Sequence, residues 1–101
     1  MMSYRPLYSE TSKKQIRKLH PQIKPVVKSK IEKLQENPFS GKRLERELSG
    51  YLSMLAKRFR VIYKIRENDQ TVEIHYVGHR RDIYELYKEA VDREGQEKEV
   101  K

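Results

Sequence analysis

Three strand-like segments that follow one another directly constrain the fold more than any other feature of this chain. Residues 51–56, 59–66 and 71–78 are rich in β-branched and aromatic side chains. Only residues 57–58 separate the first segment from the second, and only residues 67–70 separate the second from the third. Connections this short join neighbouring antiparallel strands. The sequence therefore predicts two consecutive β-hairpins in one sheet.

The middle segment has two different faces, because side chains alternate along a strand. One set of alternate positions is apolar: Phe59, Val61, Tyr63 and Ile65. The other set holds Arg60, Ile62 and Lys64. We expect the first face to join the core and the second to remain available for a ligand.

The N-terminal half predicts one strand and a helical hairpin. Residues 3–8 contain a proline, which favours an edge strand. Ser9 is suited to cap a first helix that runs to Leu19, and Pro21 to open a second helix that ends at Glu36, before the next proline. Apolar residues at helical spacing in the second helix indicate that it packs on the sheet.

The remaining segments complete a small α+β domain. Residues 39–50 are rich in glycine and charge and predict a loop, whereas residues 82–93 carry an apolar stripe typical of a helix. The predicted order is β-α-α-β-β-β-α, with an antiparallel-rich twisted sheet of about four strands. We expect one domain over residues 1–92 and a charged, frayed tail over residues 93–101.

Composition limits the possible functions. The net charge is +8, and residues 1–60 hold 15 Lys/Arg against 5 Asp/Glu, so a polyanion or an acidic protein is the expected partner, with simple solubility as the alternative. The absence of cysteine excludes disulfides and thiolate metal sites, and three scattered histidines predict no metal or other cofactor. No run is apolar enough for a membrane span or a signal peptide, which favours the cytoplasm.

A cluster of chemically capable residues follows the last predicted strand. The run Gly78-His79-Arg80-Arg81-Asp82-Ile83-Tyr84 contains groups that bind phosphate and groups that transfer protons. We expect it to lie on the same small sheet as Arg60. This arrangement indicates an RNA-handling site.

Four motifs together resemble the RelE/ParE toxin superfamily of type II toxin–antitoxin systems. They are Gly41–Leu44, Leu48–Tyr51, Phe59–Tyr63 and Val77–Tyr84, in this order and spacing. The resemblance implies a microbial-RNase-like RelE fold and a monomeric toxin. It also implies an antitoxin partner that is often acidic and is encoded by an adjacent gene. The superfamily contains ribosome-dependent mRNA endonucleases and inhibitors of DNA gyrase. An inactive binding module with the same fold is a third alternative.

The resemblance also implies roles for individual residues. In RelE-type nucleases, positions matching Arg60 and Arg80 bind phosphate, and the position matching Tyr84 contacts the substrate nucleotide. His79, beside two arginines, is suited to act as general base in metal-free attack by the ribose 2′-OH. Each residue also has a purely structural alternative. The arginines would form surface ion pairs with Asp82 or Glu85, Tyr84 would pack over the sheet, and His79 would be a hydrogen-bonding structural residue. Further RNA- or phosphate-binding candidates are Arg43, Arg46, Lys57, Arg58, Arg81 and Lys88.

One departure from the RelE pattern concerns the first strand of the hairpins. The best-known RelE enzymes carry two lysines there, one residue apart, and residues 51–56 contain no lysine. Lys57, Arg58, Arg43 or Arg46 could supply the charge instead. The expected partners of a RelE-like nuclease are the ribosome and mRNA, in addition to the antitoxin.

Overall fold

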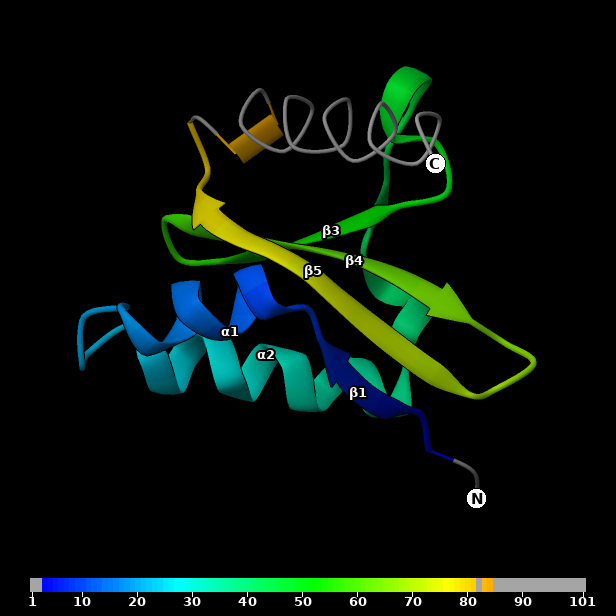
Figure 1. Cartoon of the computed structure of the whole chain (residues 1–101), viewed down its shortest axis with the longest axis horizontal. Helices are drawn as coiled ribbons and strands as arrows, with labels where there is room; N and C mark the ends of the chain where they lie inside the picture. The colour runs from blue at the N-terminus through cyan, green and yellow to red at the C-terminus, as the bar shows by residue number, and fades with distance from the viewer. Residues whose placement is uncertain (1–2, 82, 85–101) are drawn as a thin grey trace.

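A computed structural model describes residues 3–81, 83 and 84, and shows a helical hairpin packed on one face of a five-stranded sheet (Figure 1). The strands are β1 (Arg5–Tyr8), β2 (Lys42–Arg43), β3 (Leu52–Ala56), β4 (Phe59–Arg66) and β5 (Thr71–His79). The helices are α1 (Glu10–Arg17) and α2 (Lys24–Glu36), with two short 3-10 helices, η1 (Pro38–Ser40) and η2 (Arg46–Leu48). The strand order is β1-β5-β4-β3-β2.

The α+β class, the edge position of the first strand and both hairpins are confirmed. Strands β3, β4 and β5 pair antiparallel, and β4 has the bounds that the sequence predicts. Strand β1 pairs parallel with β5, which makes the sheet mixed. The helices are shorter than predicted, because residues 18–23 form a turn in which the Ile23 and Lys24 amides donate to the His20 carbonyl oxygen.

The prediction of about four strands was one short. The fifth strand is β2, which lies inside the segment predicted to be a loop. It pairs antiparallel with β3, with Lys42 opposite Ser53 and Arg43 opposite Leu52. A strand of two residues is too short to produce a recognisable alternation of polar and apolar positions, so sequence periodicity could not reveal it.

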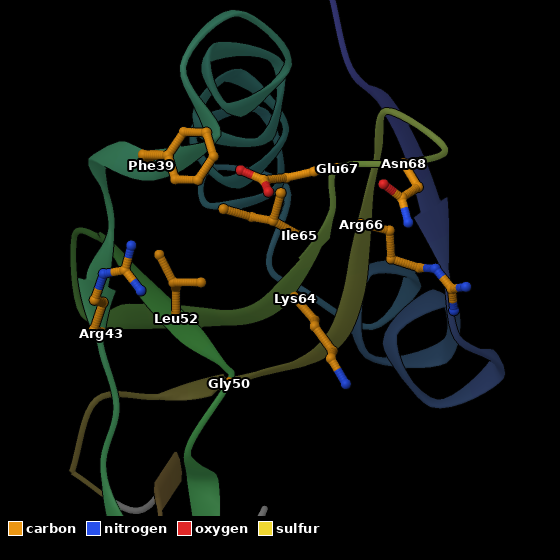
Figure 2. A pocket seen from close by; sticks show the side chains of 9 residues that line it. All are labelled: Phe39, Arg43, Gly50, Leu52, Lys64, Ile65, Arg66, Glu67 and Asn68. Atoms are coloured by element: carbon orange, nitrogen blue, oxygen red, sulfur yellow. The ribbon is translucent and has the colours of Figure 1, made fainter.

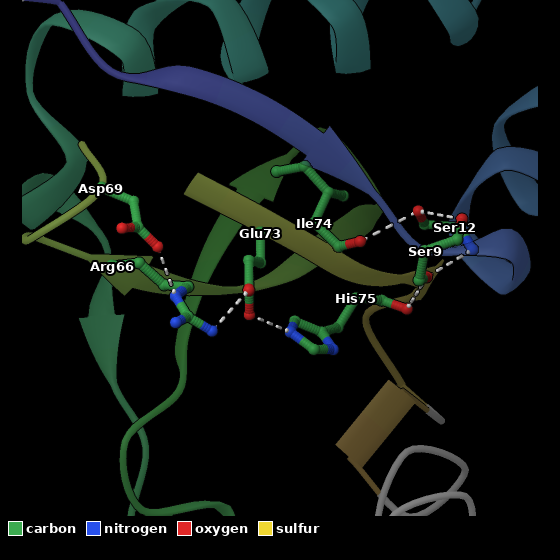
Figure 3. Close-up of polar contacts among 7 residues, drawn as sticks. All are labelled: Ser9, Ser12, Arg66, Asp69, Glu73, Ile74 and His75. Carbon is green, nitrogen blue, oxygen red and sulfur yellow. Dashed lines mark hydrogen bonds and ion pairs between the residues drawn. The ribbon is translucent and has the colours of Figure 1, made fainter. Parts of the chain in front are cut away.

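Two serines fasten α1 to β5 (Figure 3). The Ser9 Oγ accepts a hydrogen bond from the Ser12 amide at 3.0 Å, which confirms Ser9 as the N-cap. The Ser9 hydroxyl also donates to the His75 carbonyl oxygen at 2.9 Å, and the Ser12 hydroxyl donates to the Ile74 carbonyl oxygen at 3.0 Å. The start of the helix is therefore fixed in position relative to the sheet.

The main core lies between the helical hairpin and the sheet. Its buried side chains come from both helices and from β3, β4 and β5, as expected from the apolar stripe of α2. The members are Ile16, Val27, Ile31, Leu34, Leu52, Ala56, Val61, Tyr63, Val72, Ile74 and Val77. Burial of these side chains supplies most of the drive for folding.

The opposite face of the sheet is not entirely open, which corrects the expectation drawn from β4. Ile62 is fully buried there, in a second cluster with Leu48 and Ile83. The register between β4 and β5 shifts at this point, because Ile62 pairs with Tyr76 and Tyr63 pairs with Ile74. His75 is thus the extra residue of a β-bulge, a feature that breaks strict alternation.

A buried tyrosine connects β4 to the segment before β2. The Tyr63 hydroxyl donates to the Pro38 carbonyl oxygen at 2.7 Å and accepts from the Gly41 amide at 3.0 Å. Burial raises the pKa of this phenol, while the hydrogen bond from Gly41 acts in the opposite direction. The Gly41 backbone lies so close to Tyr63 that a Cβ atom there would overlap the hydroxyl and approach the Ser53 carbonyl oxygen to 2.8 Å.

We expect Gly41→Ala to destabilise the protein by about 1–3 kcal/mol, because the methyl group would push β2 away from β3 and strain the Tyr63 hydrogen bonds. Urea unfolding followed by circular dichroism would measure the change. Gly50→Ala is the comparison variant. Gly50 has open space around it, so an alanine there meets no neighbouring atom and its cost comes from the positive φ of 93° alone. An unchanged free energy of unfolding for Gly41→Ala would contradict this close approach.

Several sequence predictions fall outside the described residues. Ile83 and Tyr84 are helical, in agreement with a helix that begins near residue 82. The rest of that helix, the domain boundary at residue 92, the tail and Lys88 lie beyond the part of the chain that the structure describes. Neither α1 nor α2, nor any other described helix, has the length and apolar character needed to cross a membrane.

Candidate functional site

Arg60, Ser53 and Tyr84 form a polar cluster on the face of the sheet opposite the helices. The Arg60 Nη1 donates a hydrogen bond to the Ser53 Oγ at 3.0 Å, and the Ser53 and Tyr84 hydroxyls are hydrogen-bonded at 3.0 Å. The Arg60 Cζ lies 5.8 Å from the centre of the Tyr84 ring. We call this group the Arg60–Ser53–Tyr84 cluster. It brings together two of the four predicted catalytic residues.

The pairing of β3 with β4 explains why these residues meet. Arg60 is opposite Leu55 and Ile62 is opposite Ser53, so the side chains of both pairs project from the same face of the sheet. Ile83 packs on Ile62 in the second apolar cluster, and this contact holds the following residue, Tyr84, over Ser53. The cluster therefore depends on burial next to it.

The cluster is suited to receive an anion. Ser53 is buried with 1% of its surface exposed, whereas Arg60 and Tyr84 are half-buried. Among the described residues, Arg60 forms no ion pair with a carboxylate; its identified contacts are the Ser53 hydroxyl and the Tyr84 ring. The remaining N–H groups of the guanidinium can bind a phosphate through the bidentate hydrogen bonds typical of arginine.

Ser53 is a residue that sequence reasoning missed. It lies in the strand where the paired lysines of RelE enzymes are absent, and it is the central member of the cluster. A buried serine in an otherwise apolar strand requires a hydrogen-bond partner, which is a weak signal that could have drawn attention to it. Its partner Tyr84 lies 31 residues further along the chain, so no local pattern could identify the pair.

The two predicted phosphate-binding arginines of the segment before β3, Arg43 and Arg46, lie at the borders of two pockets. Arg43 is opposite Leu52, and Figure 2 shows its side chain beside Leu52 at the edge of a 620 Å³ pocket. Arg43 also borders a second pocket of 440 Å³, which Arg46 of η2, Lys42 and Tyr84 line as well. Both arginines therefore border the pocket that Tyr84 of the cluster lines.

The larger pocket is lined by three cations, one carboxylate and a few apolar side chains; the cations are Arg43, Lys64 and Arg66. Figure 2 shows Leu52 beside Arg43, and Ile65 beside the carboxylate of Glu67, with Phe39 between the two pairs at the border of the pocket. None of the four predicted catalytic residues, all of which lie in the described part of the chain, lines this pocket, whereas Arg60 and Tyr84 meet at the Arg60–Ser53–Tyr84 cluster. We therefore place the candidate nucleic-acid site at the cluster.

His79 lies apart from Arg60 and Tyr84. It is opposite Phe59, its ring centroid is 5.8 Å from that of Phe59, and Phe59 packs against the helix-side core. The His79 Nδ1 accepts a hydrogen bond from the Arg81 amide at 3.2 Å. The structure therefore places the imidazole on the helix side of the sheet, where it shapes the turn that carries the arginines.

The other predicted cations surround the end of the sheet near the cluster. Lys57 and Arg58 are exposed in the turn between β3 and β4, and Lys57 has a positive φ of 55°. The Arg80 amide donates to the Arg58 carbonyl oxygen at 2.8 Å, which holds the segment after β5 beside this turn. Arg80 and Arg81 are both exposed, whereas their proposed surface partners Asp82 and Glu85 lie outside the described residues.

A separate charged network occupies the other end of β5 (Figure 3). Arg66 is paired with Asp69 at 3.2 Å and with Glu73 at 3.4 Å, and the other Glu73 oxygen lies 3.1 Å from the His75 Nε2. His75 lies on the same face as Arg60, because its ring packs edge-on against Tyr51, which packs against the second apolar cluster. Its contact with Glu73 makes it part of this network rather than of the cluster. Among the described residues, no group of histidine and acidic side chains is arranged to hold a metal ion.

Comparison with known proteins defines the class first. Residues 7–84 match the family model described as the ParE toxin of the type II toxin–antitoxin system parDE, so the chain is a type II toxin. It is also 36% identical over 85 residues to the toxin RelG of Mycobacterium tuberculosis, covering 82% of this chain and 98% of that protein. The chain belongs to the RelE/ParE toxin superfamily.

Solved structures agree with this assignment. The toxin–antitoxin complex RelBE2 of M. tuberculosis contains a chain that is 34% identical, with a TM-score of 0.70, covering 77% of this chain and 99% of that one. A mutant of the Escherichia coli toxin RelE in the free state is 26% identical, with a TM-score of 0.73, covering 91% of this chain and 98% of that one. The mixed sheet and helical hairpin are thus those of the RelE fold.

Proposed function

We propose that this toxin blocks translation by cutting mRNA on the ribosome. The observation that carries the proposal is the Arg60–Ser53–Tyr84 cluster, where a half-buried arginine with no described carboxylate partner lies beside an aromatic hydroxyl. The likeness to RelE and RelG supports the same activity.

The proposed chemistry is metal-free transesterification. The ribose 2′-oxygen attacks the adjacent phosphorus, the bond from phosphorus to the 5′-oxygen breaks, and the products are a 2′,3′-cyclic phosphate and a 5′-hydroxyl. The 2′-OH loses its proton and the 5′-oxygen gains one, so the reaction needs no net proton supply. Arg60 would stabilise the charge that develops on the phosphorane oxygens.

The other residues take supporting roles in this proposal. Tyr84 would stack on a base next to the scissile bond or orient its 2′-OH, because its ring is half-buried and its hydroxyl is fixed by Ser53. Arg80, Arg81, Lys57 and Arg58 would bind neighbouring phosphates. We propose that His79 positions the Arg80–Arg81 turn rather than acting as general base, because its ring lies on the helix side of the sheet.

An acidic antitoxin is the proposed protein partner. The similar solved structures include toxin–antitoxin complexes of the RelB–RelE type, among them one from M. tuberculosis and one from E. coli. The excess of positive charge in residues 1–60 would attract a negatively charged partner segment. We propose that the toxin alone is a cytoplasmic monomer whose activity the antitoxin blocks.

Addition of the purified toxin to a cell-free translation reaction tests the proposed function. Primer extension on the message should reveal new 5′ ends inside translated codons, absent when the ribosomes are omitted. Arg60→Gln toxin is the matched control. An intact message at toxin concentrations that stop translation in this reaction would exclude mRNA cleavage.

Inhibition of DNA gyrase is the second candidate, because the family model that matches residues 7–84 is that of the ParE toxin. Strand β3 carries no lysine beside the cluster, which also distinguishes this chain from the best-known RelE nucleases. A supercoiling assay with purified gyrase separates the two functions. Unchanged supercoiling at concentrations that stop translation would exclude the ParE-like activity.

A further inference from the structure

Strand β2 places a lysine next to the Arg60–Ser53–Tyr84 cluster. Lys42 is paired with Ser53, and residues paired across antiparallel strands project from the same face, with Cβ atoms about 5 Å apart. The neighbouring Arg43 is paired with Leu52 and projects from the helix side. The register of this two-residue strand thus directs Lys42, rather than Arg43, to the face of the sheet that carries the cluster, while Arg43 borders the pocket of Tyr84 from the strand edge.

The surroundings of Lys42 are open and polar. Lys42 and Tyr84 line the same 440 Å³ pocket, which Arg43 and Arg46 also border. Glu45 and Glu47 lie on the pocket as well, so its lining is not uniformly positive. Lys42 is exposed, and within residues 3–81, 83 and 84 its side chain forms no hydrogen bond or ion pair.

We propose that Lys42 binds an RNA phosphate next to the scissile one, a role that rests on the proposed endonuclease function. Neighbouring strands lie about 4.8 Å apart, so the two steps from β4 through β3 to β2 separate their backbones by about 10 Å. A lysine at this distance from Arg60 meets a flanking phosphate rather than the same one. Strand β3, between them, contains no charged residue.

This assignment identifies a source of positive charge for a site whose central strand carries no cation. Lysine acts as a mobile point charge on a long flexible stem, which suits contact with the backbone of a single strand. RNA would then cross the sheet from Arg60 on β4 towards Lys42 on β2, with Tyr84 between them against Ser53.

Two measurements on the full-length protein test the role of Lys42. The first is single-turnover cleavage of message on programmed ribosomes, where Lys42→Gln should be about tenfold slower than the wild type. The second is binding to a short fluorescent single-stranded RNA with 2′-O-methyl groups, which removes the nucleophile. The slope of log affinity against log salt should be smaller by about 0.7 for Lys42→Gln, the value for one lost phosphate contact.

Two further variants serve as controls. Lys42→Arg keeps the positive charge and should restore the salt slope and most of the cleavage rate. Lys14→Gln removes the same charge from the exposed surface of α1, on the other side of the sheet, and should leave both measurements close to the wild type. Melting temperatures of all variants identify any loss of folding.

The outcomes separate this inference from the proposed function. Cleavage by Lys42→Gln at the wild-type rate with an unchanged salt slope would overturn the role of Lys42, even if the toxin is an endonuclease. A wild-type toxin that binds RNA through Lys42 but leaves messages intact on ribosomes would support the contact and overturn the proposed function. A wild-type toxin that neither binds nor cuts RNA would overturn both.

Discussion

Arg60→Gln is expected to slow mRNA cleavage by about two to three orders of magnitude while the toxin remains folded. The substitution removes the half-buried positive charge, but the glutamine amide can still donate a hydrogen bond towards Ser53. The loss should therefore appear in the rate of the chemical step. Single-turnover cleavage on programmed ribosomes, with saturating toxin, measures that step directly.

Arg17→Gln is the matched control for Arg60→Gln. It also removes one arginine charge, but from an exposed position in the last turn of α1, on the helix side of the sheet. We expect its cleavage rate to stay within about twofold of the wild type. If Arg60→Gln cut messages as fast as Arg17→Gln, the cluster would not be the catalytic site.

Tyr63→Ala is expected to lower the free energy of unfolding by about 3–5 kcal/mol. Tyr63 is fully buried, so truncation opens a cavity in the main core and removes both hydrogen bonds to the segment before β2. Urea unfolding monitored by circular dichroism gives the value. Working in an Arg60→Gln background would allow host cells to tolerate expression of the protein.

Tyr63→Phe divides this effect into its parts. It preserves most of the packing but leaves the Pro38 carbonyl oxygen and the Gly41 amide without their shared partner, which should cost about 1–3 kcal/mol. A phenylalanine variant as stable as the wild type would show that water replaces the hydroxyl. An alanine variant with nearly wild-type stability would contradict the packing of the core around Tyr63.

The hairpins and the helical pair could be predicted from local sequence because their signals are local. Alternation over residues 59–66 predicts the bounds of β4. Ser9 predicts the start of α1, because a serine at this position can accept a hydrogen bond from the Ser12 amide, as it does in the structure. Strand β2 could not be predicted in this way. It exists because Gly41 lets the chain approach Tyr63 and β3 closely, a contact made across the fold.

The candidate site was predictable only in part. Arg60 and Tyr84 were found from the strand pattern and the family resemblance, but Ser53 and Lys42 depend on strand register, which periodicity alone does not fix. The bulge at His75 changes which face each β5 residue occupies: strict alternation would place Tyr76 with Val72 and Ile74, but Tyr76 packs against the second apolar cluster. His79 illustrates the same effect, since its pairing with Phe59 turns the ring towards the helix side.

The proposed cleavage mechanism predicts which chemical groups remain at the cut ends of the message. These groups distinguish cleavage by the toxin from cleavage by nucleases that use water. Attack by the 2′-OH leaves a 5′-hydroxyl on the downstream fragment, whereas hydrolysis by water that expels the 3′-oxygen leaves a 5′-phosphate there. The two ends are distinguished by whether a ligase accepts the fragment before or after treatment with a polynucleotide kinase.

The most direct measurement is therefore to sequence the 5′-hydroxyl ends of a translated message after paired incubations with wild-type and Arg60→Gln toxin. We predict abundant 5′-hydroxyl ends inside the reading frame with the wild type, strongly reduced with Arg60→Gln and absent without ribosomes. An intact message, fragments with 5′-phosphate ends, or equal cutting by both proteins would contradict an RNA-cleaving site at the Arg60–Ser53–Tyr84 cluster.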